Sequence, residues 1–307
     1  MKRNYGMLCS INRILAALTA TALITACSYY GYPVAVKEET PKQHQDRSIS
    51  MNLKDKQHCG EWKVLKLGEY ELHNNVWGKG SITNFRQCVF TKKPALSDYQ
   101  FGWSWNWPEV DYTVKSYPSV LYGRKPWNDY STTHRLPVKV SKLESLKVEY
   151  ALSEQSVGAM NLLLELWVTD TPTPSPYNRT REIAIHMYQK EWPAQGGDFV
   201  ESLVIDETRY DFHKNDAIIV PGDDHKWAYL AFVNSGWPKY QAKVDVKKFV
   251  DYLVENGHMS KDEYIVSVEL GNEITEGQGE TKVKKFQVDV VASEYPRQNL
   301  ASNSNQN

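Results

Sequence analysis

Apolar residues alternate with polar or small residues along most of the central part of this chain, and this period of two constrains the fold more than any other feature. In residues 162–169, Leu162, Leu164, Leu166 and Val168 fall on one side of an extended strand, and the residues between them fall on the other. The pattern predicts a protein built from many short strands. Further strands are predicted at residues 63–72, 112–120, 146–151, 181–188, 227–233, 264–270 and 282–291.

Helical periodicity is convincing in one segment only. Residues 246–255 carry apolar side chains at helical spacing, Asp245 offers an N-cap, and Asn256-Gly257 is a typical helix end. Many strands and a single late helix indicate an all-β protein with two packed sheets.

The first residues have the features of an export signal. Lys2, Arg3 and Arg13 precede the almost wholly apolar residues 14–26, and this run is shorter than the 20 or so residues of a spanning helix. The run ends in Ile24-Thr-Ala-Cys27, which is similar to a bacterial lipobox. We therefore expect residues 1–26 to be a lipoprotein signal peptide and Cys27 to carry a lipid anchor. An ordinary cleaved signal, with Cys27 incidental, is the alternative.

The segments on either side of the strand-rich region are polar. Residues 27–57 have mixed charge and no sustained hydrophobic period, which predicts a flexible tether, and residues 295–307 are predicted to be a disordered tail. Residues 58–294 remain as one folded domain. We expect an exported monomer, attached to the cell envelope, outer membrane or cell surface, that touches the membrane only through its anchor. The formal net charge of −1 argues against a nucleic-acid partner.

Cysteine usage also fits export. Cys9 lies in the signal and Cys27 at the processing site, which leaves Cys59 and Cys88 in the folded domain. Two cysteines in strand-like segments of an exported protein suggest one disulfide, which would contribute about 3–4 kcal/mol through chain entropy. Two free thiols are the alternative.

Strand parity places four glutamates on sheet faces that point away from the core. Glu165 alternates with the apolar set of its strand, and Glu182 shares a face with Ala184, His186 and Tyr188. In the last such strand, the side predicted to face the core carries Tyr264, Val266, Val268 and Leu270, and the opposite side carries Glu269 and Glu273.

Carboxyl groups gathered on one face can hydrolyse a glycosidic bond. One carboxylate attacks the anomeric carbon while a second carboxyl protonates the leaving oxygen. Crowding raises the pKa of one of the pair, so that it stays protonated near neutral pH. This chemistry needs no metal, and we expect none and no cofactor. G-x-S-x-G, H-E-x-x-H, C-x-x-C and glycine-rich phosphate motifs are absent from the sequence.

The first block of motifs resembles a known family. Cys59-Gly-Glu-Trp62, Tyr70-Glu-Leu-His-Asn-Asn-Val-Trp-Gly78 and Gln87-Cys88 are similar to the start of glycoside hydrolase family 12, the jelly-roll endoglucanases and xyloglucanases. Members carry an N-N-L-W-G motif flanked by two disulfide-bonded cysteines. The resemblance implies that Asn75 and Trp77 bind a sugar in the non-reducing half of a cleft.

Two further blocks resemble the catalytic strands of that family. Leu164-Glu-Leu-Trp167 and Arg181-Glu-Ile-Ala-Ile-His186 are similar to its Y-D-[IL]-[WF] and E-[IL]-M-I-W segments, and residues 264–273 to its G-x-E strand. The resemblance implies that Glu182 is the nucleophile and Glu273 the general acid/base. Glu165 takes the place of an Asp that assists the nucleophile.

The resemblance implies a two-sheet jelly-roll β-sandwich with one helix and a concave substrate cleft. It implies a retaining endo-β-1,4-glucanase that acts on β-glucan polysaccharide, whether cellulose-like, mixed-linkage or xyloglucan, by double displacement. A catalytically weak, glycan-binding surface lipoprotein is the alternative. Three departures from the family pattern stand out. Glu165 replaces an Asp and is one methylene longer, and Ala184 and His186 replace Met and Trp. Trp192-Pro-Ala-Gln-Gly196 replaces a Pro-Ile-Gly loop, so that no leaving-group contacts are implied.

Overall fold

The computed structural model describes residues 54–295, apart from 94–97, 112, 193–195 and 219–224. The predicted signal peptide, Cys27, most of the tether and all but the first residue of the predicted tail lie outside these residues. The end of the tether prediction is wrong, because Lys56–His58 forms strand β1 and pairs with β4 (Arg86–Thr91). The folded domain therefore starts within the last residues of the predicted tether.

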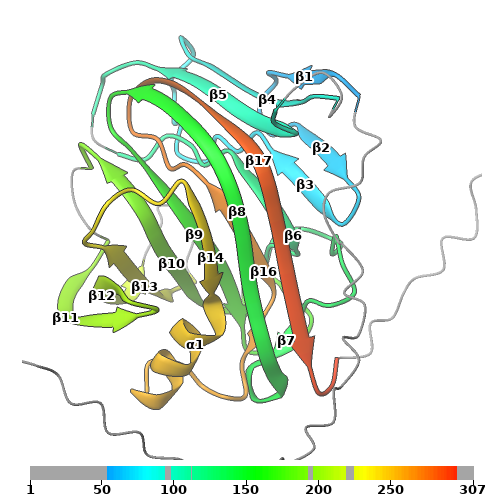
Figure 1. The fold of residues 1–307 in the computed structure, drawn as a ribbon, viewed down its shortest axis with the longest axis vertical. Coiled ribbons are helices and arrows are strands. Elements are labelled where there is room, and N and C mark those ends of the chain that lie inside the picture. Colours follow the sequence, from blue (N-terminus) through cyan, green and yellow to red (C-terminus); the bar gives the residue numbers. More distant parts are fainter. Residues whose placement is uncertain (1–53, 94–97, 112, 193–195, 219–224, 296–307) are drawn as a thin grey trace, which may run out of the picture. The chain divides into compact units, whose positions relative to one another are not determined.

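The described residues form two β-sheets (Figure 1). The smaller sheet contains, in spatial order, β1, β4 (Arg86–Thr91), β5 (Phe101–Trp107), β17 (Gly277–Ala292), β8 (Leu143–Val157) and β14 (Gln241–Asp245).

The larger sheet runs through β11 (Asp198–Ile205), β12 (Thr208–Ile218), β13 (Trp227–Asn234), β10 (Arg179–Lys190), β9 (Met160–Thr169), β16 (Ser267–Gly271), β6 (Ser119–Gly123), β3 (Tyr70–His73) and β2 (Val64–Leu67). The short strands β7 (Val138–Lys139) and β15 (Tyr264–Ile265) pair beside this path. Within the described part of the chain, β10 and β13 are parallel and the other paired strands are antiparallel.

The hydrophobic core lies between the two sheets, and alternate residues of each strand fill it. Leu162, Leu164, Leu166 and Val168 of β9 are all buried there, as predicted, together with Trp103 of the smaller sheet. Figure 1 shows β8 and β17 lying across β9 and β16. The predicted two-sheet sandwich is confirmed. The face of β9 that carries Glu165 points away from this core.

The helix is confirmed at its predicted bounds. Helix α1 (Val246–Glu255) buries its apolar face in the core, and Gly257 follows it with φ of +73°, a left-handed conformation that suits glycine. The N-cap prediction is wrong in one respect, because the side chain of Asp245 makes no capping hydrogen bond. Among the residues that the structure describes, no helix is long and apolar enough to cross a membrane.

Two strand predictions need correction. Residues 63–72 form two strands, β2 and β3, because the chain turns at Gly68, whose φ is +69°. Residues 112–120 are strand only from Ser119, where β6 begins. The preceding segment instead donates isolated backbone hydrogen bonds, from Lys115 to Ile274 and from Tyr117 to Asn75.

The predicted parity of residues 264–270 is wrong in its first half. Tyr264 and Val266 pack with Trp167 and Trp227 on the face away from the core, whereas Ile265 lies in the core. The reason is a one-residue slip in pairing with β9 between β15 and β16, which moves alternate side chains to the other face. From β16 onward the parity is as predicted.

A second slip affects β10. The pairing with β9 shifts between His186 and Tyr188, and Tyr188 consequently packs against the core, with its ring centroid 5.6 Å from that of Tyr240. Tyr188 therefore does not share the face of Glu182, as predicted. Its hydroxyl lies outside the cleft described below.

Candidate active site

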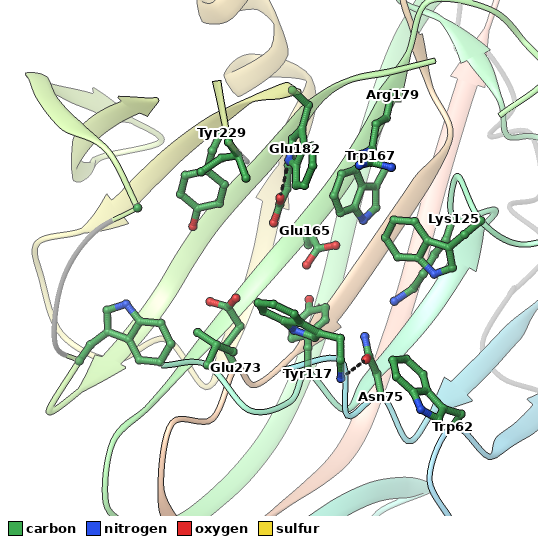
Figure 2. Close-up of a pocket in the computed structure, with 17 residues that line it drawn as sticks. Trp62, Asn75, Tyr117, Lys125, Glu165, Trp167, Arg179, Glu182, Tyr229 and Glu273 are labelled. Atoms are coloured by element: carbon green, nitrogen blue, oxygen red, sulfur yellow. Dashed lines mark hydrogen bonds between the residues drawn. The ribbon is translucent and has the colours of Figure 1, made fainter. Parts of the chain in front are cut away.

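A cleft of about 550 Å³ lies on the face of the larger sheet that points away from the core. Its walls come from β9, β10 and β13 and from segments that follow β3, β6 and β16 (Figure 2). The cleft brings together five residues predicted from the sequence: Asn75, Trp77, Glu165, Glu182 and Glu273. Among the predicted candidate glutamates, Glu269 is the one that does not line it.

Glu182 lies near the start of β10, directly across from Trp167 of β9 and Tyr229 of β13. Its carboxylate accepts a hydrogen bond of 3.0 Å from Trp227 Nε1, a partner that the sequence did not reveal. Burial raises the pKa of Glu182 to about 7, against the lowering effect of the Trp227 bond, and the charges of Glu273 and Glu269 raise it further. Glu182 is therefore only partly ionised at neutral pH.

Glu273 follows β16 and is held by Asn161, which the sequence also did not reveal. Asn161 Nδ2 donates to the Glu273 carboxylate at 2.6 Å, and the Glu273 backbone N–H donates to Asn161 Oδ1 at 2.9 Å. Burial raises the pKa of Glu273 to about 7, and the Asn161 hydrogen bond opposes this rise. The side chain thus has a fixed position and titrates near neutral pH.

Glu165 lies deeper, with 6% of its surface exposed, between Ala184 on one neighbouring strand and Glu269 on the other. Burial raises its pKa well above the usual range, and the charges of Glu269 and Glu182 raise it further. Both effects favour the neutral form of this carboxyl, whereas the charge of Lys125 favours its ionised form.

Glu269 is fully buried beneath the cleft and forms an ion pair with Lys125. Lys125 Nζ lies 2.6 Å from a Glu269 carboxylate oxygen, to which Ser119 Oγ also donates at 2.8 Å. The Lys125 charge lowers the pKa of both Glu165 and Glu182. Lys125 follows β6 in a segment without periodicity, so its role could not be predicted from the sequence.

Three tryptophans form one wall of the cleft. The Trp167 ring centroid lies 5.1 Å from that of Trp127 and 5.9 Å from that of Trp227. The Arg179 guanidinium lies 4.2 Å from the Trp227 ring centroid. Such apolar ring surfaces suit the C–H faces of sugar rings and exclude water from the neighbouring carboxyls.

Asn75 and Trp77 lie at one end of the cleft, after β3. Asn75 Oδ1 accepts a 3.0 Å hydrogen bond from the Trp77 backbone N–H, and the Trp77 side chain is 49% exposed. Only glycine fits at position 78, because a Cβ atom there would lie 1.9 Å from the Val114 carbonyl oxygen.

Trp62 flanks the same end of the cleft (Figure 2). It lies three residues after Cys59, which forms the predicted disulfide with Cys88. The disulfide prediction is confirmed, and the free-thiol alternative is wrong.

The chemistry that this arrangement permits follows from the two carboxyls that titrate near pH 7. Glu182 and Glu273 line one cleft, and one can be ionised while the other retains its proton. A carboxylate and a carboxylic acid beside a bound sugar are the two groups that glycoside hydrolysis requires.

Comparison with known proteins gives a consistent result. The family model described as "Glycosyl hydrolase family 12" matches residues 68–291. Endoglucanase S of Pectobacterium parmentieri is 29% identical over 243 residues, which cover 78% of this chain and 87% of that protein. A protein of Phytophthora nicotianae named an inactive glycoside hydrolase is 20% identical, over 70% of this chain and 83% of its own. Among solved structures, the native family 12 xyloglucanase of Bacillus licheniformis superimposes with a TM-score of 0.70 at 25% identity, covering 77% of this chain and all of that one.

Proposed function

Because this chain belongs to glycosyl hydrolase family 12, we propose that it is a retaining endo-β-1,4-glucanase that hydrolyses internal bonds of β-glucan chains. The observation that carries the proposal is the pair Glu182 and Glu273, which line one cleft and both titrate near pH 7. The family match alone identifies the chain as a glycoside hydrolase, whichever glucan it acts on.

In the proposed reaction, ionised Glu182 attacks the anomeric carbon while protonated Glu273 gives its proton to the leaving oxygen. A covalent glycosyl-enzyme forms, and Glu273, now ionised, takes a proton from the water that cleaves it. Trp227 Nε1–H stabilises the charge on Glu182, and Asn161 holds Glu273 in place. Glu165, whose pKa is raised by burial, lies on the strand next to that of Glu182 and assists the nucleophile.

The proposed substrates are cellulose-like, mixed-linkage or xyloglucan chains. The exposed ring of Trp77 can stack on a pyranose, and Asn75 can hydrogen-bond the same sugar in the non-reducing half of the cleft. The names of the relatives, an endoglucanase and a xyloglucanase, support this substrate class. No cofactor is invoked in this chemistry.

The test is the release of reducing sugar from carboxymethylcellulose, barley glucan and xyloglucan. Glu182→Gln and Glu273→Gln should each lower turnover by several orders of magnitude, with folding checked by circular dichroism. Glu149→Gln, on the smaller sheet, is the matched control and should retain wild-type rates. Near-wild-type turnover in either cleft variant would exclude that residue from its role, and inversion at the anomeric centre of the product would exclude retention.

A catalytically weak glycan-binding protein is the second candidate, since one relative is named inactive. The same assay separates the two candidates. Wild-type protein that binds these glucans but releases sugar at background level on all of them would establish binding alone.

We also propose that the protein is an exported monomer with a lipid on Cys27, which lies outside the described residues. The lipobox-like Ile24-Thr-Ala-Cys27 supports this proposal. Metabolic labelling with a fatty acid should mark the wild-type protein and not a Cys27→Ser variant. Absence of label on the wild type would leave an ordinary signal peptide.

A further inference from the structure

Tyr229 occupies the end of the cleft opposite to Asn75 and Trp77. It lies on β13, next to β10, whereas Asn75 and Trp77 follow β3, and the strands β10, β9, β16 and β6 lie between these two ends. Figure 2 shows the Tyr229 hydroxyl pointing into the cleft on the side of Glu273. Burial raises the pKa of the Tyr229 hydroxyl well above its usual range, and the charge of Glu273 raises it further.

Small residues on both sides make room for the Tyr229 ring. The ring packs against a cluster on the cleft floor that contains Ala184 and Ala231, which face each other across β10 and β13. On another side, a Cβ atom at Gly196 would lie 2.5 Å from the Tyr229 ring. A bulkier residue at position 184 or 196 would force the Tyr229 ring to move. The position of this ring therefore depends on the small side chain of Ala184.

His186 holds the Tyr229 hydroxyl from below the cleft. His186 is 1% exposed, and burial, with a smaller effect of His213, lowers its pKa to about 3, so its ring is neutral at neutral pH. Its Nδ1 lies 3.2 Å from Gln189 Nε2 and its Nε2 lies 3.1 Å from the Tyr229 hydroxyl oxygen.

These contacts decide which atom donates. An amide nitrogen can only donate, so Gln189 donates to His186 Nδ1, and the single ring proton of neutral His186 lies on Nε2. Nε2–H then donates to the Tyr229 hydroxyl oxygen, which leaves the hydroxyl proton of Tyr229 free to point into the cleft. Gln189, His186 and Tyr229 thus present a fixed hydrogen-bond donor beside Glu273.

We propose that Tyr229 is a substrate-binding residue of the leaving-group half of the cleft, where its hydroxyl donates to the sugar that departs, and that His186 is its positioning residue. The inference rests on the proposed function. The proposal explains both replacements in β10: the small side chain of Ala184 leaves room for the Tyr229 ring, and His186 orients the Tyr229 hydroxyl.

The experiment compares two substrates that differ only in the leaving-group half. One is a cello-oligosaccharide that spans the cleft, and the other is an aryl β-cellotrioside whose leaving group is a nitrophenol. Tyr229→Phe keeps the ring and its packing but removes the donor. It should lower kcat/KM on the spanning substrate about tenfold and on the aryl glycoside less than twofold. Tyr188→Phe, from the core face of the same sheet, is the matched control and should change neither rate.

His186→Phe tests the positioning role. It should give the same selective loss, and the double variant His186→Phe/Tyr229→Phe should lose no more than Tyr229→Phe alone, because both changes remove one interaction. Thermal unfolding monitors the folding of each variant, and Tyr229→Phe decides the proposal if His186→Phe does not fold.

The outcomes are distinct. Equal losses on both substrates, or no loss on either, in an otherwise active enzyme would overturn this inference alone. Wild-type protein that cleaves neither substrate would overturn the proposed function and this inference with it.

Discussion

Removing only one partner of the ion pair between Lys125 and Glu269 should strongly destabilise the folded protein. Lys125 is 2% exposed and Glu269 fully buried, and their charged atoms lie 2.6 Å apart. Lys125→Met keeps most of the side-chain volume but removes the cation. Glu269 would retain a hydrogen bond from Ser119 to one oxygen, while its other oxygen already has no hydrogen-bond partner. A buried carboxylate left in this state costs about 3–5 kcal/mol.

That magnitude is measurable as a change in thermal stability. For a domain of this size, 1 kcal/mol shifts the melting temperature by about 2–4 °C, so Lys125→Met should lower it by about 6–20 °C. Glu269→Gln should also destabilise the protein, because it leaves Lys125 buried without its anion. The double variant Lys125→Met/Glu269→Gln should recover most of the loss, since neither charge remains.

Calorimetry or urea unfolding of the three variants tests the reasoning. Losses that add in the double variant, or a single-variant loss below about 1 kcal/mol, would refute it. Activity gives an independent readout. Lys125 lowers the pKa of Glu182, so Lys125→Met should raise that pKa and move the acid limb of the pH–rate profile to higher pH.

Three further predictions follow from the titrating groups and the disulfide. Because the pKa values of Glu182 and Glu273 are both about 7, kcat/KM measured against pH should follow a bell with its maximum within about one unit of pH 7; a maximum near pH 4 would contradict the raised values. The folded-state pKa of Glu273 lies above its ordinary 4.5, so this carboxyl favours the native state below pH 4.5 and loses that advantage as pH rises through 7. Urea unfolding should therefore find Glu273→Gln more stable than wild type at pH 8, by at most about 3 kcal/mol, and equal to it at pH 4; the reverse order would contradict the sign. Replacing Cys59 and Cys88 by Ala should lower the free energy of unfolding by about 3–4 kcal/mol in a denaturant titration, and an unchanged midpoint would show that the link is not stabilising.

Those parts of the fold that depend on local pattern could be predicted from the sequence. The alternation in β9 and β10 placed Glu165 and Glu182 on the cleft face, and the spacing in residues 246–255 gave the helix at its observed bounds. The prediction failed where pairing changes register. The slip between β15 and β16 turns Tyr264 and Val266 to the cleft side, and one strand read alone does not reveal an extra residue relative to its neighbour.

The supporting residues of the site could not be predicted, because each acts across a long separation in the chain. Lys125 is a charged residue in an aperiodic segment, and its burial depends on Glu269, which is reached only when β6 and β16 pair. Asn161 precedes Leu162 at an ordinary strand position, and its contact with Glu273 exists only in the folded sheet. Side-chain partners of this kind become visible when the strand order is known.

A chain of hydrogen bonds connects the core to Glu273. Trp103 of the smaller sheet donates through Nε1 to Asn272 Oδ1 at 2.7 Å, and Asn272 Nδ2 donates to the Asn161 carbonyl at 2.8 Å. Asn161 in turn holds the Glu273 carboxylate. Asn161 and Asn272 are fully buried, so loosening either would leave polar groups without partners in the interior. The position of the proposed acid/base is thus set by hydrogen bonds that link the two packed sheets.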